Sequence, residues 1–342
     1  MKIWEGYRKG INLGGWFSQC NHEKAHYDTF IKDEDFRVIA SWGLDHVRVP
    51  VDYELLETED GSAWEDGYER LQKVVRLCRE NGLHMILDLH KTAGYSFDAN
   101  EGEAGFFENE ALQERFYALW ETIAKHFGKD ADMLAFELLN EITKKAYGPA
   151  WNRIAKECIR RIRAIAPDTW ILVGGYEYNS AVAVKDIDVP DDGHIVYNFH
   201  CYEPLIFTHQ GAYWHPMMDR AYRLSVRAPF EKMAQDAVRM GSQSNAGFEK
   251  YPADTTLSAA YFIDFMAEAA ACAEKKNVPL YCGEYGVIDC ASPEDALEWF
   301  RMIHEAFEHY GIGRAAWSYR QMDFGLSDPR MDDVRAELLL NL

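Results

Sequence analysis

The sequence predicts an α/β protein that folds as one (β/α)8 TIM barrel over residues 1–342. Eight apolar runs of strand length alternate with segments of helical pattern, and no low-complexity linker divides the chain. The runs are almost continuously hydrophobic, which is typical of parallel strands that are covered on both faces. Such barrels often exceed ~250 residues as one domain, so the length requires no second one. The runs lie at residues 11–15, 45–51, 84–90, 133–141, 170–175, 194–200, 279–284 and 314–319.

Helix start and stop signals separate these runs. Asp33 is expected to cap a helix, and Asn81-Gly82 is a left-handed helix stop. Ser292-Pro293 offers a capping hydroxyl followed by proline at the first helical position. A doubly wound open sheet is the alternative fold, but it usually has fewer strands and a Gly-rich phosphate turn. Helices are expected at about residues 33–43, 64–82 and 149–167 and after residue 292.

One connection is far longer than a barrel loop needs. About 55 residues, approximately 203–257, follow the sixth strand, whereas most such loops have fewer than ten residues. Residues 230–240 within it have helical spacing. We expect an inserted helical subdomain on the active-site face of the barrel, where it would wall the substrate cleft. The alternative is an insertion without a role in binding.

The charge of the chain narrows the range of partners. Lys and Arg number 36 against 56 Asp and Glu, which gives a net charge of −20. Such a field repels phosphate backbones and anionic lipid surfaces, so neither nucleic acid nor a membrane is expected as a partner. A neutral substrate such as a sugar is compatible with this net charge. The net charge can equally serve only to keep the protein in solution. A monomer is expected.

Seven cysteines without a CxxC pair indicate reduced, mostly buried thiols rather than a disulfide framework. The first residues contain no apolar stretch of signal-peptide length, and no stretch has the length of a membrane span. A cytoplasmic location is therefore expected, or secretion if a leader has been removed.

Polar residues stand where the apolar runs end. Glu141 ends the fourth run and Glu284 ends the seventh. A buried carboxylate is costly inside a barrel, but the carboxyl ends of the strands meet at the mouth, where active sites of such barrels lie. The other residues at these ends are Arg48, His90, Asn140, His200, Tyr202 and Trp317.

Two facing carboxylates predict glycosidic bond hydrolysis. One acid protonates the leaving oxygen, and in a retaining enzyme the second attacks the anomeric carbon from about 5–5.5 Å away. Arg48 is expected to keep the nucleophile ionised, and Tyr202 to donate a hydrogen bond to it. Asn140 is expected to bond the sugar 2-hydroxyl. Each residue alone is as often structural as catalytic; their common position at the strand ends favours a site.

These positions resemble the signature of glycoside hydrolase family 5, the large cellulase family. The resemblance rests on Arg48, His90, Asn140-Glu141, His200, Tyr202, Glu284 and Trp317 and extends over essentially the whole chain. It is nearest to compact clostridial endoglucanases, which share a stretch like residues 10–16 and a helical insertion after strand six. The resemblance implies that Glu141 is the acid/base and Glu284 the nucleophile, with retention of configuration and no cofactor.

Several motifs point elsewhere and are weaker. His22-Glu23-Lys24-Ala25-His26 matches the zinc-binding HExxH pattern, but no helix of useful length is expected there and no third ligand is evident, so no metal is expected. Gly174-Gly175 lacks the remaining residues of a phosphate turn.

We therefore expect an endo-acting, retaining hydrolase of β-1,4-glucan, either cellulose or mixed-linkage glucan. Sugar-binding residues are expected to be His90 and Trp317 at the strand ends, Trp16 after the first strand and Trp214 in the insertion. The alternatives are a β-mannanase, a xyloglucanase, a β-1,3-glucanase, or a catalytically silent barrel that only binds glycans.

Overall fold

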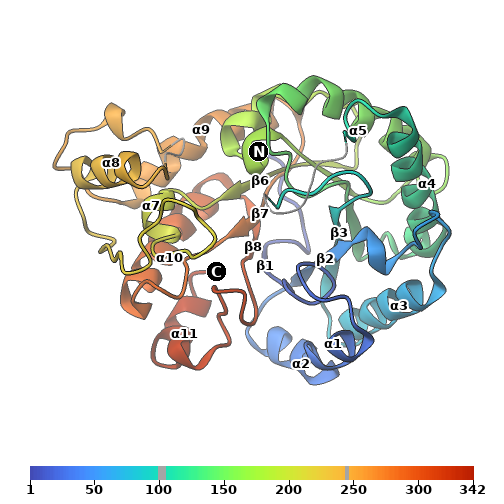
Figure 1. Cartoon of the computed structure of the whole chain (residues 1–342), viewed down its shortest axis with the longest axis horizontal. Coiled ribbons are helices and arrows are strands. Elements are labelled where there is room, and N and C mark those ends of the chain that lie inside the picture. The colour runs from blue at the N-terminus through green and yellow to red at the C-terminus, as the bar shows by residue number, and fades with distance from the viewer. Residues whose placement is uncertain (99–104, 243–245) are drawn as a thin grey trace.

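The computed structural model describes residues 1–98, 105–242 and 246–342. Eight parallel strands close into a barrel in sequence order, and β8 pairs with β1 (Figure 1). The predicted (β/α)8 fold is confirmed. The strands are β1 (Lys9–Asn12), β2 (His46–Asp52), β3 (His84–Lys91), β4 (Leu134–Glu137), β5 (Ile171–Gly174), β6 (Ile195–Cys201), β7 (Leu280–Tyr285) and β8 (Gly313–Ala316).

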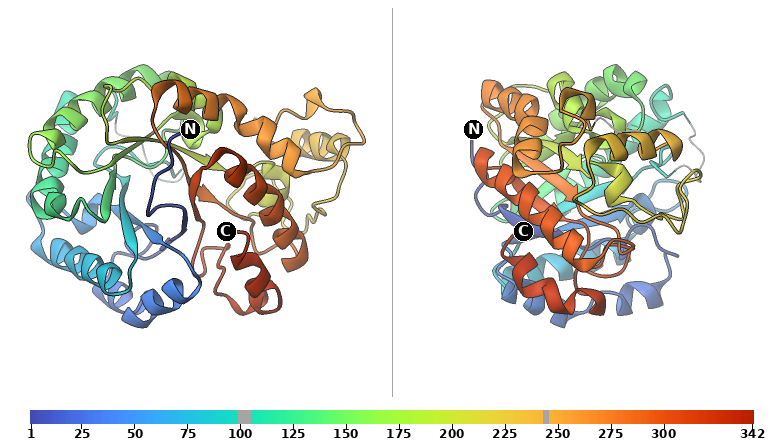
Figure 2. Two further views of the ribbon diagram at one scale, coloured as in Figure 1. Left: turned by 180° about the vertical axis from the view of Figure 1, so that it is seen from behind. Right: turned by 90° about the vertical axis from the view of Figure 1, so that its left-hand side faces the viewer.

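Helices form a ring around the strands, as the two further views in Figure 2 also show. Ser292 caps the helix after β7 by accepting the backbone N–H of Asp295 at 3.1 Å, as expected. The start of α2 differs by one residue, because Lys32 occupies the cap position and the Asp35 carboxylate accepts its N–H at 2.8 Å. The ring comprises α1 (Lys24–Thr29), α2 (Asp33–Ser41), α3 (Glu65–Glu80), α4 (Glu110–Phe127), α5 (Gly148–Arg163), α6 (Tyr176–Asn179), α9 (Ala259–Lys276), α10 (Pro293–Tyr310) and α11 (Asp332–Leu339).

The interior of the barrel changes from apolar to polar along the strands. Near the strand starts it is filled by an apolar layer that the N-terminal segment closes, with Trp4 stacked on Tyr7 at 3.8 Å. Two residues further along, the interior positions of β3, β4 and β6 hold Asp88, Glu137 and Asn198, since alternate residues of a strand face the same side. The apolar layer comprises Ile86, Ala135, Leu172, Val196, Tyr281 and Ala315.

The long connection after β6 contains α7 (Leu205–Thr208) and α8 (Phe230–Arg239), followed by a 3-10 turn at Phe248–Lys250. The helix expected at residues 230–240 is therefore present. Phe230 packs on Tyr261 of α9 with ring centroids 5.4 Å apart, so the insertion shares its core with the barrel helices. In Figure 1 the insertion extends the molecule to one side, beside α9 and α10.

Within the described residues, we find no helix that combines the length and the hydropathy needed to cross a membrane.

Candidate active site

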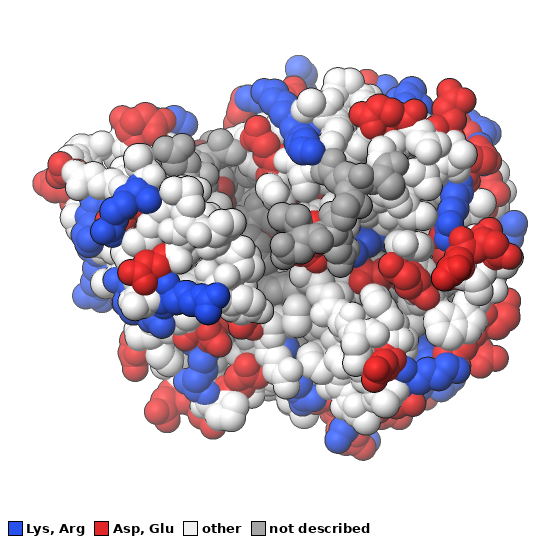
Figure 3. Space-filling model, in the orientation of Figure 1, with Lys and Arg blue, Asp and Glu red and all other residues white. Residues whose placement is uncertain are grey.

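The carboxyl ends of the strands form one face of the molecule, toward the viewer in Figures 1 and 3. Figure 3 shows acidic and basic residues interspersed around the rim of this face. The residues expected at the mouth are brought together there. One carboxylate oxygen of Glu141, one ring nitrogen of His200 and one carboxylate oxygen of Glu284 all lie within 4.8 Å of one another.

Arg48, on β2, holds the centre of this site. Its side chain is fully buried, and its Nη1 donates to Glu284 Oε1 at 2.8 Å. Its Nη2 donates to Asn140 Oδ1 at 2.8 Å, which links the two strand ends that carry the carboxylates. The guanidinium is planar and always charged, so it fixes the positions of both partners while it compensates the buried negative charge.

Glu284 carries the hydrogen bonds expected of an ionised carboxylate. Besides Arg48, Tyr202 donates its hydroxyl to Glu284 Oε2 at 2.9 Å. Burial raises the pKa of Glu284, whereas Arg48 and the Tyr202 hydroxyl act to lower it. Both donors favour the charged form of this group.

Glu141 has a different environment. Burial first, and then the negative charge of Glu284, raise the pKa of Glu141 well above its ordinary value. His200 Nδ1 contacts Glu141 Oε1 at 2.8 Å, and burial lowers the pKa of His200 well below its usual range, so the ring is neutral. Neither Arg48 nor Tyr202 bonds to Glu141 in the described structure. The two carboxyl groups are therefore unequal: Glu141 retains a proton more readily than Glu284 does.

His90 and Trp317 lie at the same mouth. Their rings are parallel, with centroids 6.0 Å apart. Burial lowers the pKa of His90 to about 4, and its Nδ1 contacts Asp88 Oδ2 at 2.6 Å. A neutral ring that donates through Nδ1 presents Nε2 as an acceptor. The Asn140 Nδ2 group is buried and has no hydrogen-bond partner among the described residues, which leaves a donor for a ligand.

The two other tryptophans expected to bind sugar are placed differently. Trp16 is 6% exposed, stacks on Phe17 at 4.0 Å and donates its indole N–H to the Tyr27 carbonyl at 2.8 Å. The ring packs against Phe17 inside the fold, and sugar binding by Trp16 stays a prediction. Trp214 is 40% exposed and lies on the inserted segment.

The two histidines of the HExxH stretch have separate partners. His26 Nε2 contacts the Gly15 carbonyl at 2.7 Å, while His22 Nδ1 contacts the Tyr27 hydroxyl at 2.9 Å and its Nε2 lies 3.4 Å from Asp52. α1 begins only at Lys24, so the two histidines do not share a helical face. His22, Asp52 and Glu54 do lie within reach of a common ion, but Asp52 already accepts the hydroxyl of Ser18.

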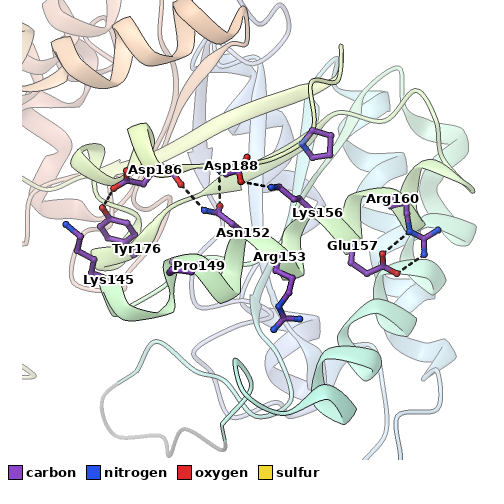
Figure 4. Close-up of a pocket in the computed structure, with 12 residues that line it drawn as sticks. Lys145, Pro149, Asn152, Arg153, Lys156, Glu157, Arg160, Tyr176, Asp186 and Asp188 are labelled. Atoms are coloured by element: carbon purple, nitrogen blue, oxygen red, sulfur yellow. Dashed lines mark hydrogen bonds and ion pairs between the residues drawn. The ribbon is translucent and has the colours of Figure 1, made fainter.

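A groove of about 950 Å³ lies on the flank of the barrel rather than at its mouth. Figure 4 shows that it runs along α5 and the segment after β5. Several of its charged side chains pair with each other, as Lys156 does with Asp188 and Arg160 with Glu157. We assign no chemistry to it.

Four polar residues of the site have no role assigned from the sequence, namely Asn12, Asp88, Glu137 and Asn198. All are buried and lie within strands. Asn12 accepts from Arg48 Nη1 at 2.9 Å, and Asp88 lies 3.1 Å from Arg48 Nη2. The signal that could have found them is a charged or amide side chain inside an otherwise apolar run.

Known proteins resemble this chain along most of its length. The family model "Cellulase (glycosyl hydrolase family 5)" matches residues 7–323. Cellodextrinase A of Ruminococcus flavefaciens is 50% identical over 309 residues, which is 90% of this chain and 84% of that protein. Endoglucanase C of Acetivibrio thermocellus is 36% identical over 344 residues and covers 97% of both chains.

Solved structures show the same fold. An endoglucanase from the hyperthermophilic Thermotoga maritima superimposes with a TM-score of 0.76 at 24% identity, covering 98% of this chain and 97% of its own. A cellulose synthase subunit from Clostridioides difficile has the same TM-score and identity, covering 100% of this chain and 99% of its own.

Proposed function

This chain belongs to glycosyl hydrolase family 5, the cellulase family, and we propose that it is an endo-acting, retaining hydrolase of β-1,4-glucan. The observation that carries the proposal is the carboxylate pair. Oxygens of Glu141 and Glu284 lie within 4.8 Å of each other, the separation of a retaining enzyme rather than the ~6.5–9.5 Å of an inverting one. The relatives named a cellodextrinase and an endoglucanase support the choice of glucan.

In the first step a carboxylate oxygen of Glu284 attacks the anomeric carbon of the sugar at the mouth. A bond forms between that oxygen and the carbon while the glycosidic bond to the leaving oxygen breaks. Glu141 gives its proton to the leaving oxygen, so the departing chain end leaves as a neutral alcohol. The inequality of the two groups fits these roles, because Arg48 and Tyr202 both donate hydrogen bonds to Glu284, whereas burial and the charge of Glu284 raise the pKa of Glu141.

In the second step Glu141, now ionised, takes a proton from a water molecule. The water oxygen bonds to the anomeric carbon and the bond to Glu284 breaks, which restores both carboxyl groups to their starting states. Two inversions at one carbon give net retention. We expect the pKa of Glu141 to fall once the ester has formed. The esterified Glu284 is uncharged and no longer repels the negative charge of Glu141.

We propose that polar groups at the mouth hold the substrate. Asn140 offers its free Nδ2 to the 2-hydroxyl of the reacting sugar, and His90 offers Nε2 as an acceptor for another hydroxyl. Trp317 supplies a flat face for the ring. These hydrogen bonds are most valuable where they strengthen in the transition state.

Trp214 extends the binding surface outward from the nucleophile. Tyr202, which bonds to Glu284, lies edge-on to His209 at 5.1 Å, and His209 lies edge-on to Trp214 at 6.2 Å. Tyr213 beside it is 63% exposed. We propose that this aromatic run binds sugar units beyond the cleaved one, so the inserted segment favours longer glucan chains.

A panel of soluble substrates tests the proposal. Cellulose derivative, mixed-linkage glucan, mannan, xyloglucan and β-1,3-glucan are incubated with the enzyme and product lengths are recorded. Rapid production of mixed oligosaccharides from β-1,4-glucan supports it. If mannan, xyloglucan or β-1,3-glucan is cleaved preferentially, the proposed substrate is wrong and the proposed mechanism stands. If no glycan is cleaved while polysaccharide retards the protein in a gel, the chain is a binding module.

A further inference from the structure

Arg48 is shared among more acids than it can neutralise. Besides Glu284 it pairs with two other buried carboxylates, Asp88 at 3.1 Å and Glu137 at 2.7 Å. A guanidinium has five N–H donors, and the carboxylates, Asn12 and Asn140 together use all of its nitrogens. The position of the Arg48 guanidinium therefore depends on which carboxylate binds it most strongly.

Glu137 binds the Arg48 guanidinium through two hydrogen bonds. Arg48 Nε donates to Glu137 Oε2 at 2.7 Å and Arg48 Nη2 donates to Glu137 Oε1 at 2.8 Å, the parallel pair that gives geometric specificity. Asn198 Nδ2 also donates to Glu137 Oε1, at 2.8 Å. By comparison, Glu284 receives a single bond from the guanidinium.

We propose that Glu137 is a positioning residue for catalysis, which orients Arg48 and sets how much of its positive charge acts on Glu284 and Glu141. This inference rests on the proposed function and deepens it. Glu137 lies on β4 four residues before Glu141 and is 1% exposed, so it acts through Arg48 and touches no substrate.

The sign of its effect follows from charge. An ionised Glu137 offsets the field of Arg48, and without it that field favours ionisation of the two neighbouring carboxyl groups. Burial raises the pKa of Glu137 to about 7, so its negative charge is fully present only above that pH. Its removal therefore acts most strongly on the alkaline limb of the activity profile, where Glu141 loses the proton that catalysis requires.

The experiment compares the pH dependence of kcat/KM for the parent enzyme and Glu137→Gln. We expect the alkaline limb to move to lower pH by about one unit, the acid limb to move less, and kcat to fall more than tenfold with little change in KM. Asp35→Asn is the matched control. Asp35 is also a buried carboxylate; it pairs with Arg320 at 2.9 Å and accepts the hydroxyl of Tyr319, away from Arg48.

The control should lower Tm without moving either limb. If Glu137→Gln lowers Tm but leaves both limbs in place, Glu137 is only a packing residue and the inference fails. Glu137→Asp keeps the negative charge and shortens the side chain. We expect kcat to fall while both limbs of the pH profile stay in place. A parental kcat would overturn the inference even if the Gln variant does not fold.

A readout that needs no turnover separates this inference from the proposed function. In protein labelled with 13C at glutamate carboxyls, the Glu141 signal is the one absent in Glu141→Gln, and its titration follows the pKa directly. In Glu137→Gln that pKa should fall. An unchanged titration counts against the role of Glu137 whether or not the enzyme cleaves glucan, while absence of cleavage by the parent counts against the proposed function alone.

Discussion

Replacing Tyr202 with Phe removes the hydroxyl that donates a hydrogen bond to the nucleophile and keeps the aromatic ring. The Tyr202 hydroxyl lies 2.9 Å from Glu284 Oε2; Glu284 is buried and Tyr202 is partly buried. A hydrogen bond to a charged group contributes about 1.5–3 kcal/mol. Since ~1.4 kcal/mol corresponds to one pKa unit, the pKa of Glu284 should rise by about one to two units in the variant.

The direction of this pKa shift determines the expected pH dependence of kcat/KM. A higher pKa keeps Glu284 protonated over a wider acid range, so the acid limb of kcat/KM should move upward by about one unit or more while the alkaline limb stays near its parental position. The assay is the initial rate on soluble β-1,4-glucan at concentrations well below KM, from pH 4 to 9. An acid limb that does not move would refute the assignment of Tyr202 as a stabiliser of the ionised nucleophile.

The remaining predictions concern the acid, the sugar platform and the fold. Glu141→Gln should lose over 10³-fold in kcat on glucan but retain cleavage of aryl glycosides whose leaving group needs no proton; equal losses on both would remove Glu141 from the acid role. A Cβ at Gly14 would lie 2.7 Å from the Trp317 ring, so Gly14→Ala should raise KM several-fold, whereas Gly193→Ala, with no atom within 4 Å, should not. Ser292→Ala should cost about 1 kcal/mol and lower Tm by about 2 °C in a thermal melt, and an unchanged Tm would deny the cap its contribution.

The strand ends could be predicted because two independent signals coincide there. An apolar run sets the strand, and the polar residue that ends it stands where a parallel barrel opens to solvent. Glu141, Glu284 and His200 were found in this way, and the structure brings them together. The capped start of α10 was equally legible, because its cap depends only on neighbouring residues.

The support beneath the site could not be predicted in the same way. Glu137 reads as one more residue of a buried run, and its partner Arg48 lies 89 residues away, so only the register of β2, β3 and β4 shows that they meet. The surroundings of the Trp16 ring could not be predicted for a related reason. Its position after β1 is visible in the sequence, but the direction in which its ring turns depends on Phe17 and Tyr27 packing against it.

The central claim is that Glu284 forms a covalent bond with the sugar, and a trapped intermediate tests it most directly. A cellobiosyl fluoride with fluorine in place of the 2-hydroxyl slows the second step more than the first, so the glycosyl enzyme accumulates. Intact-protein mass spectrometry should show the addition of one fluorinated cellobiosyl unit, and peptide mapping should place it on Glu284. Absence of an adduct in an enzyme that cleaves glucan, or an adduct on another residue, would contradict the account.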